Sequence, residues 1–248
     1  MRFGIFALRM RQPGTAFLQQ KMNDKKSFLC YDRAQEVFSF QGEKDTAVEN
    51  DPQGGRHPAG WRRYLNGWRN VMRILIVVDM QTDFIDGTLG TKEAAAIVPA
   101  VERKIRDFDG KVIFTYDTHP ENYLETQEGR NLPVKHCIEG TEGWRLPGVL
   151  DDLRIEKGAS VYRKPTFGSR YLAQDLLALS KREKIESIEL IGLCTDICVV
   201  SNALLIKAFL PETQILVDAT CCAGVTPARH RAALDTMKSC QIKITGED

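Results

Sequence analysis

Four side chains could together catalyse acyl transfer: the thiol of Cys198, the carboxylates of Asp79 and Asp117, and the ammonium group of Lys164. A carboxylate can take the proton of a thiol, and a lysine near both can hold the thiolate and stabilise developing negative charge. Backbone N–H groups at the start of a helix can bind the oxyanion that forms next. The set would be an acyl-transfer apparatus without a histidine.

Cys198 follows a predicted strand and lies near the start of a predicted helix. Residues 188–191 are mainly aliphatic and lead into Gly192, as expected of a buried strand that ends in a tight turn. The hydroxyl of Thr195 could cap the next helix, with Asp196 in its first turn. The positive end of this helix would favour the thiolate of Cys198, the reactive form. The alternative interpretation is a small buried residue without a chemical role.

Strands and helices alternate from residue 72 onward, which predicts a mostly parallel sheet with helices on both faces. Ligands of such sheets bind beyond the carboxyl ends of the strands, where all four reactive side chains fall. Residues 118–150 form a long connection rich in Gly, Pro and His, which favours a functional loop. The expected strands are 74–78, 112–116, 160–163, 188–191, 214–218 and 241–244, and the expected helices are 93–107, 169–183, 195–209 and 227–239.

The first 71 residues differ in composition from the rest of the chain. They carry 12 Lys and Arg against 7 Asp and Glu, whereas residues 72–248 carry 22 against 26. Basic and aromatic residues between 56 and 69 would suit nucleic acid, but the absence of a helical or strand period favours a poorly structured extension. We therefore expect an N-terminal extension over 1–71, a folded domain over 72–248, and Met72 as the natural start.

The cysteines and the hydropathy pattern indicate the compartment. The seven cysteines are irregularly spaced, no secretory signal precedes them, and no apolar run approaches the roughly 20 residues that cross a bilayer. We expect reduced thiols, a cytoplasmic location, and neither a membrane nor a nucleic acid as partner.

The sequence resembles the isochorismatase-like cysteine hydrolases and, within them, the nicotinamidases. The resemblance covers residues 73–244 and implies a three-layer αβα fold and a catalytic triad of Asp79, Lys164 and Cys198. It also implies a cis peptide bond between Leu193 and Cys194, with the backbone N–H groups of Cys194 and Cys198 as the oxyanion hole. The motifs that carry it are VVDMQTDF (77–84), FTYDTHPEN (114–122), HCIEGTEGW (136–144), YRKPTFGS (162–169) and GLCTDICVVSNA (192–203).

The same resemblance implies a metal site in the loop. Asp117 and His119 match an Asp-x-His motif, and His136 matches a more distant ligand. Carboxylate and imidazole ligands suit Zn, Fe or Mn. Family members differ in the remaining ligand; Glu128 is the best-placed acid here, and Glu125 is the second. Phe84 matches the aromatic residue that stacks on the substrate ring.

The activity implied is hydrolysis of nicotinamide to nicotinate and ammonia, a step of NAD salvage, through a thioester on Cys198. One alternative is a related hydrolase of another small amide, a carbamoyl compound or a vinyl ether; another is a catalytically idle binding or assembly module. A homo-oligomer would be usual for such a fold. Three other residues are given structural interpretations: Cys221 and Cys222 as small packed residues, and His230 as a solvated residue on the outer face of a late helix.

Overall fold

The computed structural model describes residues 48–50, 56–58 and 71–247. The chain divides into two compact units, residues 1–65 and 66–248. In the first unit, strands β1 (Val48–Asn50) and β2 (Arg56–Pro58) pair antiparallel. Apart from this strand pair, the expected N-terminal extension lies outside the described residues. The division at Met72 stays a prediction.

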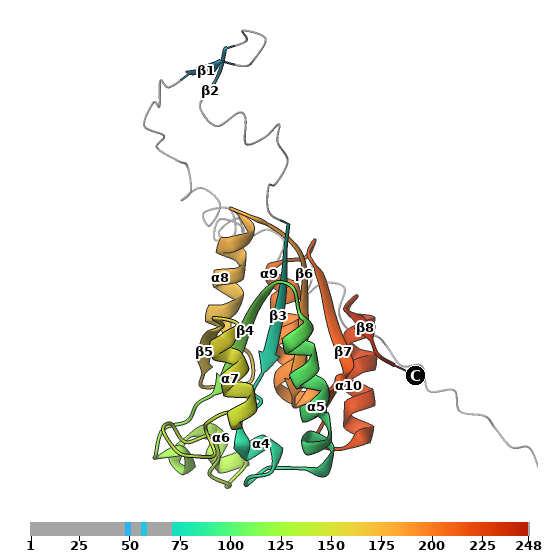
Figure 1. Ribbon diagram of the computed structural model, residues 1–248. Helices are drawn as coiled ribbons and strands as arrows, with labels where there is room; N and C mark the ends of the chain where they lie inside the picture. The colour runs from blue at the N-terminus through green and yellow to red at the C-terminus, as the bar shows by residue number, and fades with distance from the viewer. Residues whose placement is uncertain (1–47, 51–55, 59–70, 248) are drawn as a thin grey trace, which may run out of the picture. The chain divides into compact units, whose positions relative to one another are not determined.

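The second unit is built on a six-stranded parallel sheet with strand order β5-β4-β3-β6-β7-β8 (Figure 1). The central strand β3 is apolar and completely buried from residue 74 to residue 78, as expected of a strand covered on both faces. The strands are β3 (Val71–Val78), β4 (Lys111–Asp117), β5 (Ser160–Lys164), β6 (Lys184–Leu193), β7 (Gln214–Ala223) and β8 (Lys243–Thr245).

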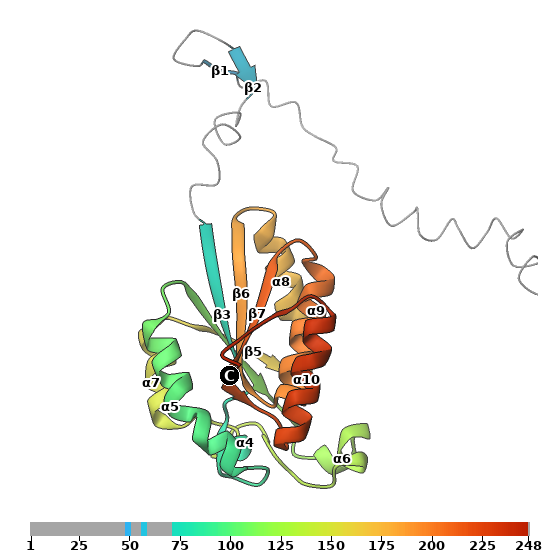
Figure 2. The same cartoon turned by 90° about the vertical axis from the view of Figure 1, so that its right-hand side faces the viewer.

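Helices cover both faces of the sheet, so the predicted three-layer αβα fold is confirmed. Helices α5 (Lys92–Asp107) and α7 (Gly148–Glu156) pack on one face. The other face carries α8 (Arg170–Ser180), α9 (Val200–Phe209) and α10 (Pro227–Ser239), as Figure 2 shows. Apolar side chains of each helix layer meet those of the sheet, which forms two buried cores.

Short helical segments interrupt the long connection and the strand ends. The loop after β4 contains a 3-10 turn, η1 (Tyr123–Glu125), and helix α6 (Gln127–Asn131). Helix α4 (Thr82–Ile85) follows β3, and a π-helical turn, η2 (Thr195–Val199), precedes α9. Of these segments, α4, η1 and α6 were not predicted because they are too short to show a period, whereas η2 forms the start of the helix expected over 195–209. Within the described ranges, no helix combines the length and hydrophobicity that a bilayer crossing requires.

Candidate active site

Asp79 lies directly after β3, and its side chain is fully buried. Its φ of 47° falls in the left-handed region, which Asp adopts more readily than most residues. Its backbone N–H donates to the carbonyl oxygen of Thr115 at 3.1 Å, and the Thr115 hydroxyl donates to Asp79 Oδ1 at 2.7 Å. These bonds to β4 fix the carboxylate and direct Oδ2 toward Lys164.

Lys164 is the last residue of β5 and is 1% exposed. Its Nζ lies 2.6 Å from Asp79 Oδ2, 3.3 Å from Asp117 Oδ1 and 3.5 Å from Cys198 Sγ. Burial opposes the charge, but the surrounding negative groups raise the pKa of Lys164 well above its usual value, so the side chain is an ammonium. The contact with Asp79 is an ion pair, since Oδ2 has no donor of good hydrogen-bond geometry among the described residues.

Cys198 lies in η2, and its side chain is buried. Burial raises the pKa of the Cys198 thiol well above its usual value, and the charge of Lys164 opposes this shift. The charge of Asp79 and a hydrogen bond with Asp79 raise the same pKa further. Burial thus opposes the thiolate that the helix end was expected to favour. A carboxylate beside the thiol can accept its proton as it reacts.

The turn between β6 and η2 depends on a close approach of two strands. Gly192 has φ 116°, and a Cβ there would lie 2.2 Å from the carbonyl oxygen of Val78. Only glycine fits this conformation and this space. The Leu193–Cys194 peptide bond is cis, as the resemblance implied.

The helix start differs from the expected one. The cap residue is Cys194, whose side chain makes no capping bond, and its carbonyl oxygen accepts from the N–H groups of Ile197 and Val199. The expectation that Thr195 caps the helix is wrong, because Thr195 is inside the π-helical turn. Its hydroxyl instead bonds to His230.

A second group of side chains lies beside Asp79, Lys164 and Cys198. This metal group consists of Asp117, His119, Glu128 and His136. One ligand atom each of Asp117, His119, Glu128 and His136 lies within 4.8 Å of the others. Asp117 Oδ2 is 3.0 Å from His119 Nε2 and 3.6 Å from His136 Nε2, and Glu128 Oε1 is 3.7 Å and 3.9 Å from the same two nitrogens. Burial would raise the pKa of Asp117, but a hydrogen bond with His119 and the charge of Lys164 hold it well below its usual range.

This donor set fits a divalent metal. His136 Nδ1 donates to the carbonyl oxygen of Val134 at 2.8 Å, so Nε2 is the ring nitrogen that faces the carboxylates and would bind a metal. Glu128 lies in the group, whereas Glu125 is exposed and accepts from Asn122 Nδ2 at 3.2 Å. Two imidazoles and two carboxylates suit a borderline transition metal.

Phe84 lies in α4, beside His136 of the metal group. Its ring is 9% exposed, and its centroid lies 5.6 Å from that of His136. An aromatic face is thus available beside both the histidine pair and the end of β3.

Residues 73–248 match the family model described as the isochorismatase domain. The chain belongs to this family.

Curated relatives and solved structures cover the same domain. The nicotinamidase/pyrazinamidase of Mycobacterium tuberculosis is 27% identical over 187 residues, which are 70% of this chain and 98% of the relative. The nicotinamidase of Schizosaccharomyces pombe is 26% identical over 208 residues, 70% of this chain and 92% of the relative.

Two crystal structures match at a similar level. That of a Bacillus subtilis nicotinamidase is 27% identical with a TM-score of 0.60 and covers 71% of this chain and 100% of its own. That of the Pyrococcus horikoshii pyrazinamidase in complex with zinc is 28% identical with a TM-score of 0.57 and covers 71% and 99%.

In this isochorismatase-family chain, two buried side chains that sequence reasoning did not single out hold the metal group in place. Gln81 Nε2 donates to the carbonyl oxygens of Asp117 and Trp144, and Gln81 Oε1 accepts from the Asp117 N–H. Asp83 accepts from the N–H of Cys137, next to His136. Both residues lie in the segment 77–84 that carries the family resemblance, and that position was the available signal.

Asn202 is another buried residue that was missed. Its Nδ2 donates to the carbonyl oxygens of Cys198 and Phe167, and its Oδ1 accepts from the Ser169 N–H. It therefore joins η2, which carries Cys198, to the loop that follows Lys164. The signals in the sequence were its position four residues after Cys198, on the same helix face, and its place in the segment 192–203 that carries the family resemblance.

The six cysteines among the described residues are all free, and Cys221 and Cys222 are buried as expected.

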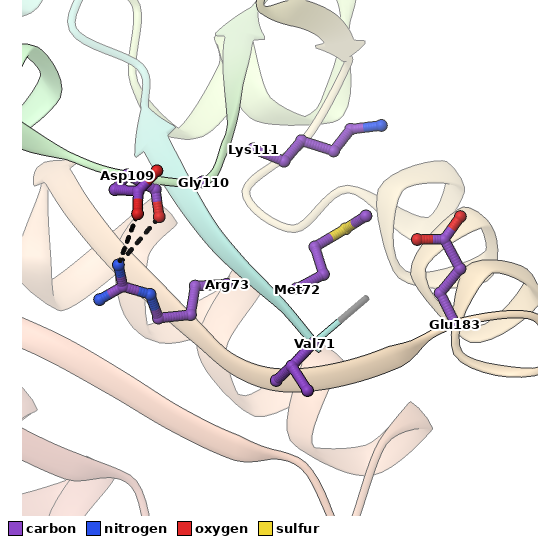
Figure 3. Close-up of a pocket in the computed structure, with 7 residues that line it drawn as sticks. All are labelled: Val71, Met72, Arg73, Asp109, Gly110, Lys111 and Glu183. Atoms are coloured by element: carbon purple, nitrogen blue, oxygen red, sulfur yellow. Dashed lines mark hydrogen bonds and ion pairs between the residues drawn. The ribbon is translucent and has the colours of Figure 1, made fainter. Parts of the chain in front are cut away.

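A separate hollow of about 350 Å³ lies at the opposite, amino-terminal end of β3 (Figure 3). Arg73 bonds there to the backbone and the carboxylate of Asp109. Lys111 and Glu183 also line the hollow. None of the triad or metal-group residues lines it, so it is not part of the candidate active site.

Proposed function

We propose that this chain is a nicotinamidase, which hydrolyses nicotinamide to nicotinate and ammonia through a thioester on Cys198. The observation that supports this most is that a single buried ammonium, Lys164, contacts the thiol of Cys198 and the carboxylates of Asp79 and Asp117. Since Asp117 also belongs to the metal group, the nucleophile and a site for a heteroaromatic ring lie side by side.

In the first step, Asp79 takes the proton of the Cys198 thiol as sulfur attacks the amide carbon. Asp79 suits this role because burial raises its pKa, although the charge of Lys164 opposes the shift. Lys164 stays protonated and stabilises the thiolate as it forms.

The attack converts the amide carbonyl into a tetrahedral oxyanion. We assign its stabilisation to the backbone N–H groups of Cys194 and Cys198. Asp79 then returns its proton to the amide nitrogen, the C–N bond breaks, and ammonia leaves. The acyl group remains on Cys198 as a thioester.

Water completes the cycle. Asp79, again a carboxylate, takes a proton from water as the water oxygen attacks the thioester carbon. The second tetrahedral intermediate uses the same N–H donors. The C–S bond then breaks, Cys198 recovers a proton through Asp79, and the product leaves as nicotinate after its carboxyl proton passes to solvent.

The metal group would orient the substrate. Asp117, His119, Glu128 and His136 would hold Zn, Fe or Mn, and such an ion, when bound, would accept the pyridine nitrogen as a ligand. Phe84 would lie against the ring. Correct placement of reacting atoms can contribute several kcal/mol, roughly 7–11 at most, to lowering a barrier.

Ammonia release from a panel of small amides tests the function. We expect nicotinamide to be the best substrate, benzamide to be poor because it lacks the ring nitrogen, and an aliphatic carbamoyl compound to be inert. A protein that rejects nicotinamide and accepts the carbamoyl compound would instead be the related amidohydrolase.

Substitution of the nucleophile tests the mechanism. Cys198→Ala should lower turnover by about 10⁴-fold or more, as in other enzymes with a covalent intermediate. Cys194→Ala should cost far less, since only its backbone is used, and Cys240→Ala on the exposed end of α10 is the matched control. A thiol-directed substrate analogue should modify Cys198 in the parent protein. An adduct on Cys194, together with full activity of the Cys198→Ala variant, would contradict the assignment.

We further propose that the enzyme works as a homo-oligomer in the reducing cytoplasm, where its nucleophile stays a free thiol. Light scattering coupled to gel filtration tests the assembly, and a monomer at micromolar concentration would contradict it.

A further inference from the structure

We propose that His230 is a positioning residue for the turn that binds the oxyanion. The inference rests on the proposed function, because that turn matters through the N–H groups of Cys194 and Cys198. His230 lies on α10, far along the chain from the nucleophile, and was expected to be solvated.

The first observation is a hydrogen bond between α10 and the turn. Thr195 is completely buried, and its Oγ1 lies 2.8 Å from His230 Nδ1. Because Thr195 directly follows Cys194 and begins η2, this bond holds the segment between the two proposed oxyanion donors. The imidazole is half-buried and therefore fixes Thr195 from outside the catalytic centre.

The second observation is an independent contact one residue further along. Asp196 Oδ1 accepts from the N–H of Val225 at 2.9 Å. At Gly224, an added Cβ would lie 2.8 Å from His230 N and 2.9 Å from Asp196 Oδ1. The loop between β7 and α10 thus packs directly on the turn, with no room for a side chain between them.

The first turn of α10 is itself held in place. Thr226 caps the helix through a bond from the Arg229 N–H to its hydroxyl at 3.2 Å, and the His230 N–H donates to the Thr226 carbonyl oxygen at 2.9 Å. The backbone that carries the imidazole is consequently fixed. A rigid support can transmit a defined position to Thr195, which a mobile surface histidine could not.

The space around the ring explains why its loss would be felt. An open hollow of about 260 Å³ adjoins His230 at the carboxyl end of β7, with Ile97 and Pro227 among its lining residues. Burial and the charge of Arg231 lower the pKa of His230, so the ring is neutral near pH 7. Removal of the neutral ring would enlarge the hollow and leave the buried Thr195 hydroxyl without this partner, which is costly.

The expected kinetic signature follows from when the turn acts. Oxyanion donors bind the transition state and not the ground state, so misplacing them lowers kcat and leaves KM nearly unchanged. Loss of one such donor costs about 10²–10³-fold, and a displaced pair should cost roughly 10- to 100-fold. Loss of a purely structural residue would instead reduce the fraction of folded enzyme.

Three substitutions at one position separate these cases. Asn places a hydrogen-bonding atom where His230 has Nδ1, one bond beyond Cγ, whereas Gln places it one bond further. We expect His230→Ala and His230→Gln to lower the kcat for nicotinamide by about tenfold or more, with KM within about twofold. His230→Asn should recover most of the rate. Asp235→Ala, an exposed residue of the same helix, is the control and should match the parent.

A double-mutant comparison locates the effect in the hydrogen bond. Thr195→Val removes the hydroxyl with little change of shape. If the bond carries the effect, His230→Ala should add little further loss of kcat in a Thr195→Val background. Full additivity of the two losses would overturn the proposal.

Hydrogen–deuterium exchange of the peptide 191–199 gives a readout that needs no substrate. His230→Ala should increase exchange there, and His230→Asn should restore protection, at concentrations matched by titration of the reactive thiol. Unchanged exchange together with unchanged kcat would overturn the proposal. A parent protein that is inactive on nicotinamide, yet shows this exchange pattern, would refute the proposed substrate and not the role of His230.

Discussion

Lys164 Nζ lies 3.3 Å from Asp117 Oδ1, while the other oxygen of the same carboxylate faces the two histidines of the metal group. One side chain therefore belongs to both halves of the candidate site. A shift of Lys164, which contacts Cys198, would therefore also disturb Asp117 and with it the metal group.

Asp117→Asn should consequently damage more than metal binding. The amide keeps the shape but removes the charge beside Lys164, and hydrogen bonds to charged groups contribute about 1.5–3 kcal/mol. Benzamide lacks the ring nitrogen and therefore does not depend on the metal. We expect its slow hydrolysis to be roughly 10- to 100-fold slower in this variant than in the parent protein. His119→Ala should lose metal and nicotinamide turnover while leaving the benzamide rate nearly unchanged. Equal benzamide rates in both variants would show that the two halves are not coupled.

The choice between two acids in the loop can be tested by metal content. Glu128 lies in the donor group with its side chain 18% exposed, whereas Glu125 is exposed and bonded to Asn122. After dialysis against a weak chelator, Glu128→Ala should retain much less metal than Glu125→Ala, measured by plasma mass spectrometry. The reverse order would assign the fourth ligand to Glu125.

Gln81 should be important for stability because it bonds to three backbone groups, a half-buried carbonyl of Trp144 and two buried groups of Asp117. Gln81→Leu keeps the approximate volume and leaves those groups without partners, at about 1–3 kcal/mol each at most. We expect a lower urea midpoint and weaker metal retention. Thr82→Ala, next along the chain, loses only a bond exposed to solvent and is the control; a Gln81→Leu protein as stable as this control would contradict the assignment.

A cluster away from the active site should govern part of the acid sensitivity. Lys104 Nζ lies 2.6 Å from Glu189 Oε1 and 2.9 Å from Asp218 Oδ2. Burial would raise the pKa of Asp218, but hydrogen bonds from Thr220 and Lys104 lower it below its usual value. A carboxyl with a depressed folded-state pKa adds stability above its unfolded pKa, near 3.9, and that stability is lost as pH falls through the folded value.

Asp218→Asn should therefore lower the melting temperature at pH 7, and the gap from the parent should narrow as the pH falls below about 4. Thermal unfolding followed by circular dichroism between pH 7 and pH 3 measures this gap. A constant gap across that range would mean that the charge of Asp218 is not the cause.

The sequence predicted the parts of the site that depend on strand ends. Asp79 and Asp117 follow or end apolar runs, Lys164 follows the short strand expected at 160–163, and parallel strands bring their carboxyl ends to one edge. Their convergence therefore followed from the element order alone. The identity of the fourth acid did not, because it depends on the path of the loop between η1 and α6.

Other features could not be predicted because they depend on long-range bonds to single groups. Gln81 and Asn202 bond to backbone groups more than 30 residues away, and His230 bonds to a hydroxyl 35 residues before it. Polar pairs of this kind leave no period in the sequence. The expected thiolate at Cys198 was argued from the helix end alone, whereas burial, which follows from packing, raises the pKa of this thiol.

The contact at Gly192 has a consequence for how this protein could acquire new substrates. Gly192 pairs with Val78, the residue before Asp79, so the base and the nucleophile turn are locked in register across β3 and β6. Gly192 should tolerate almost no substitution, not even to alanine. Evolution or engineering toward another amide must then work through the residues of the loops at 118–150 and 165–169 that lie outside the metal group, because these side chains can vary without shifting the sheet.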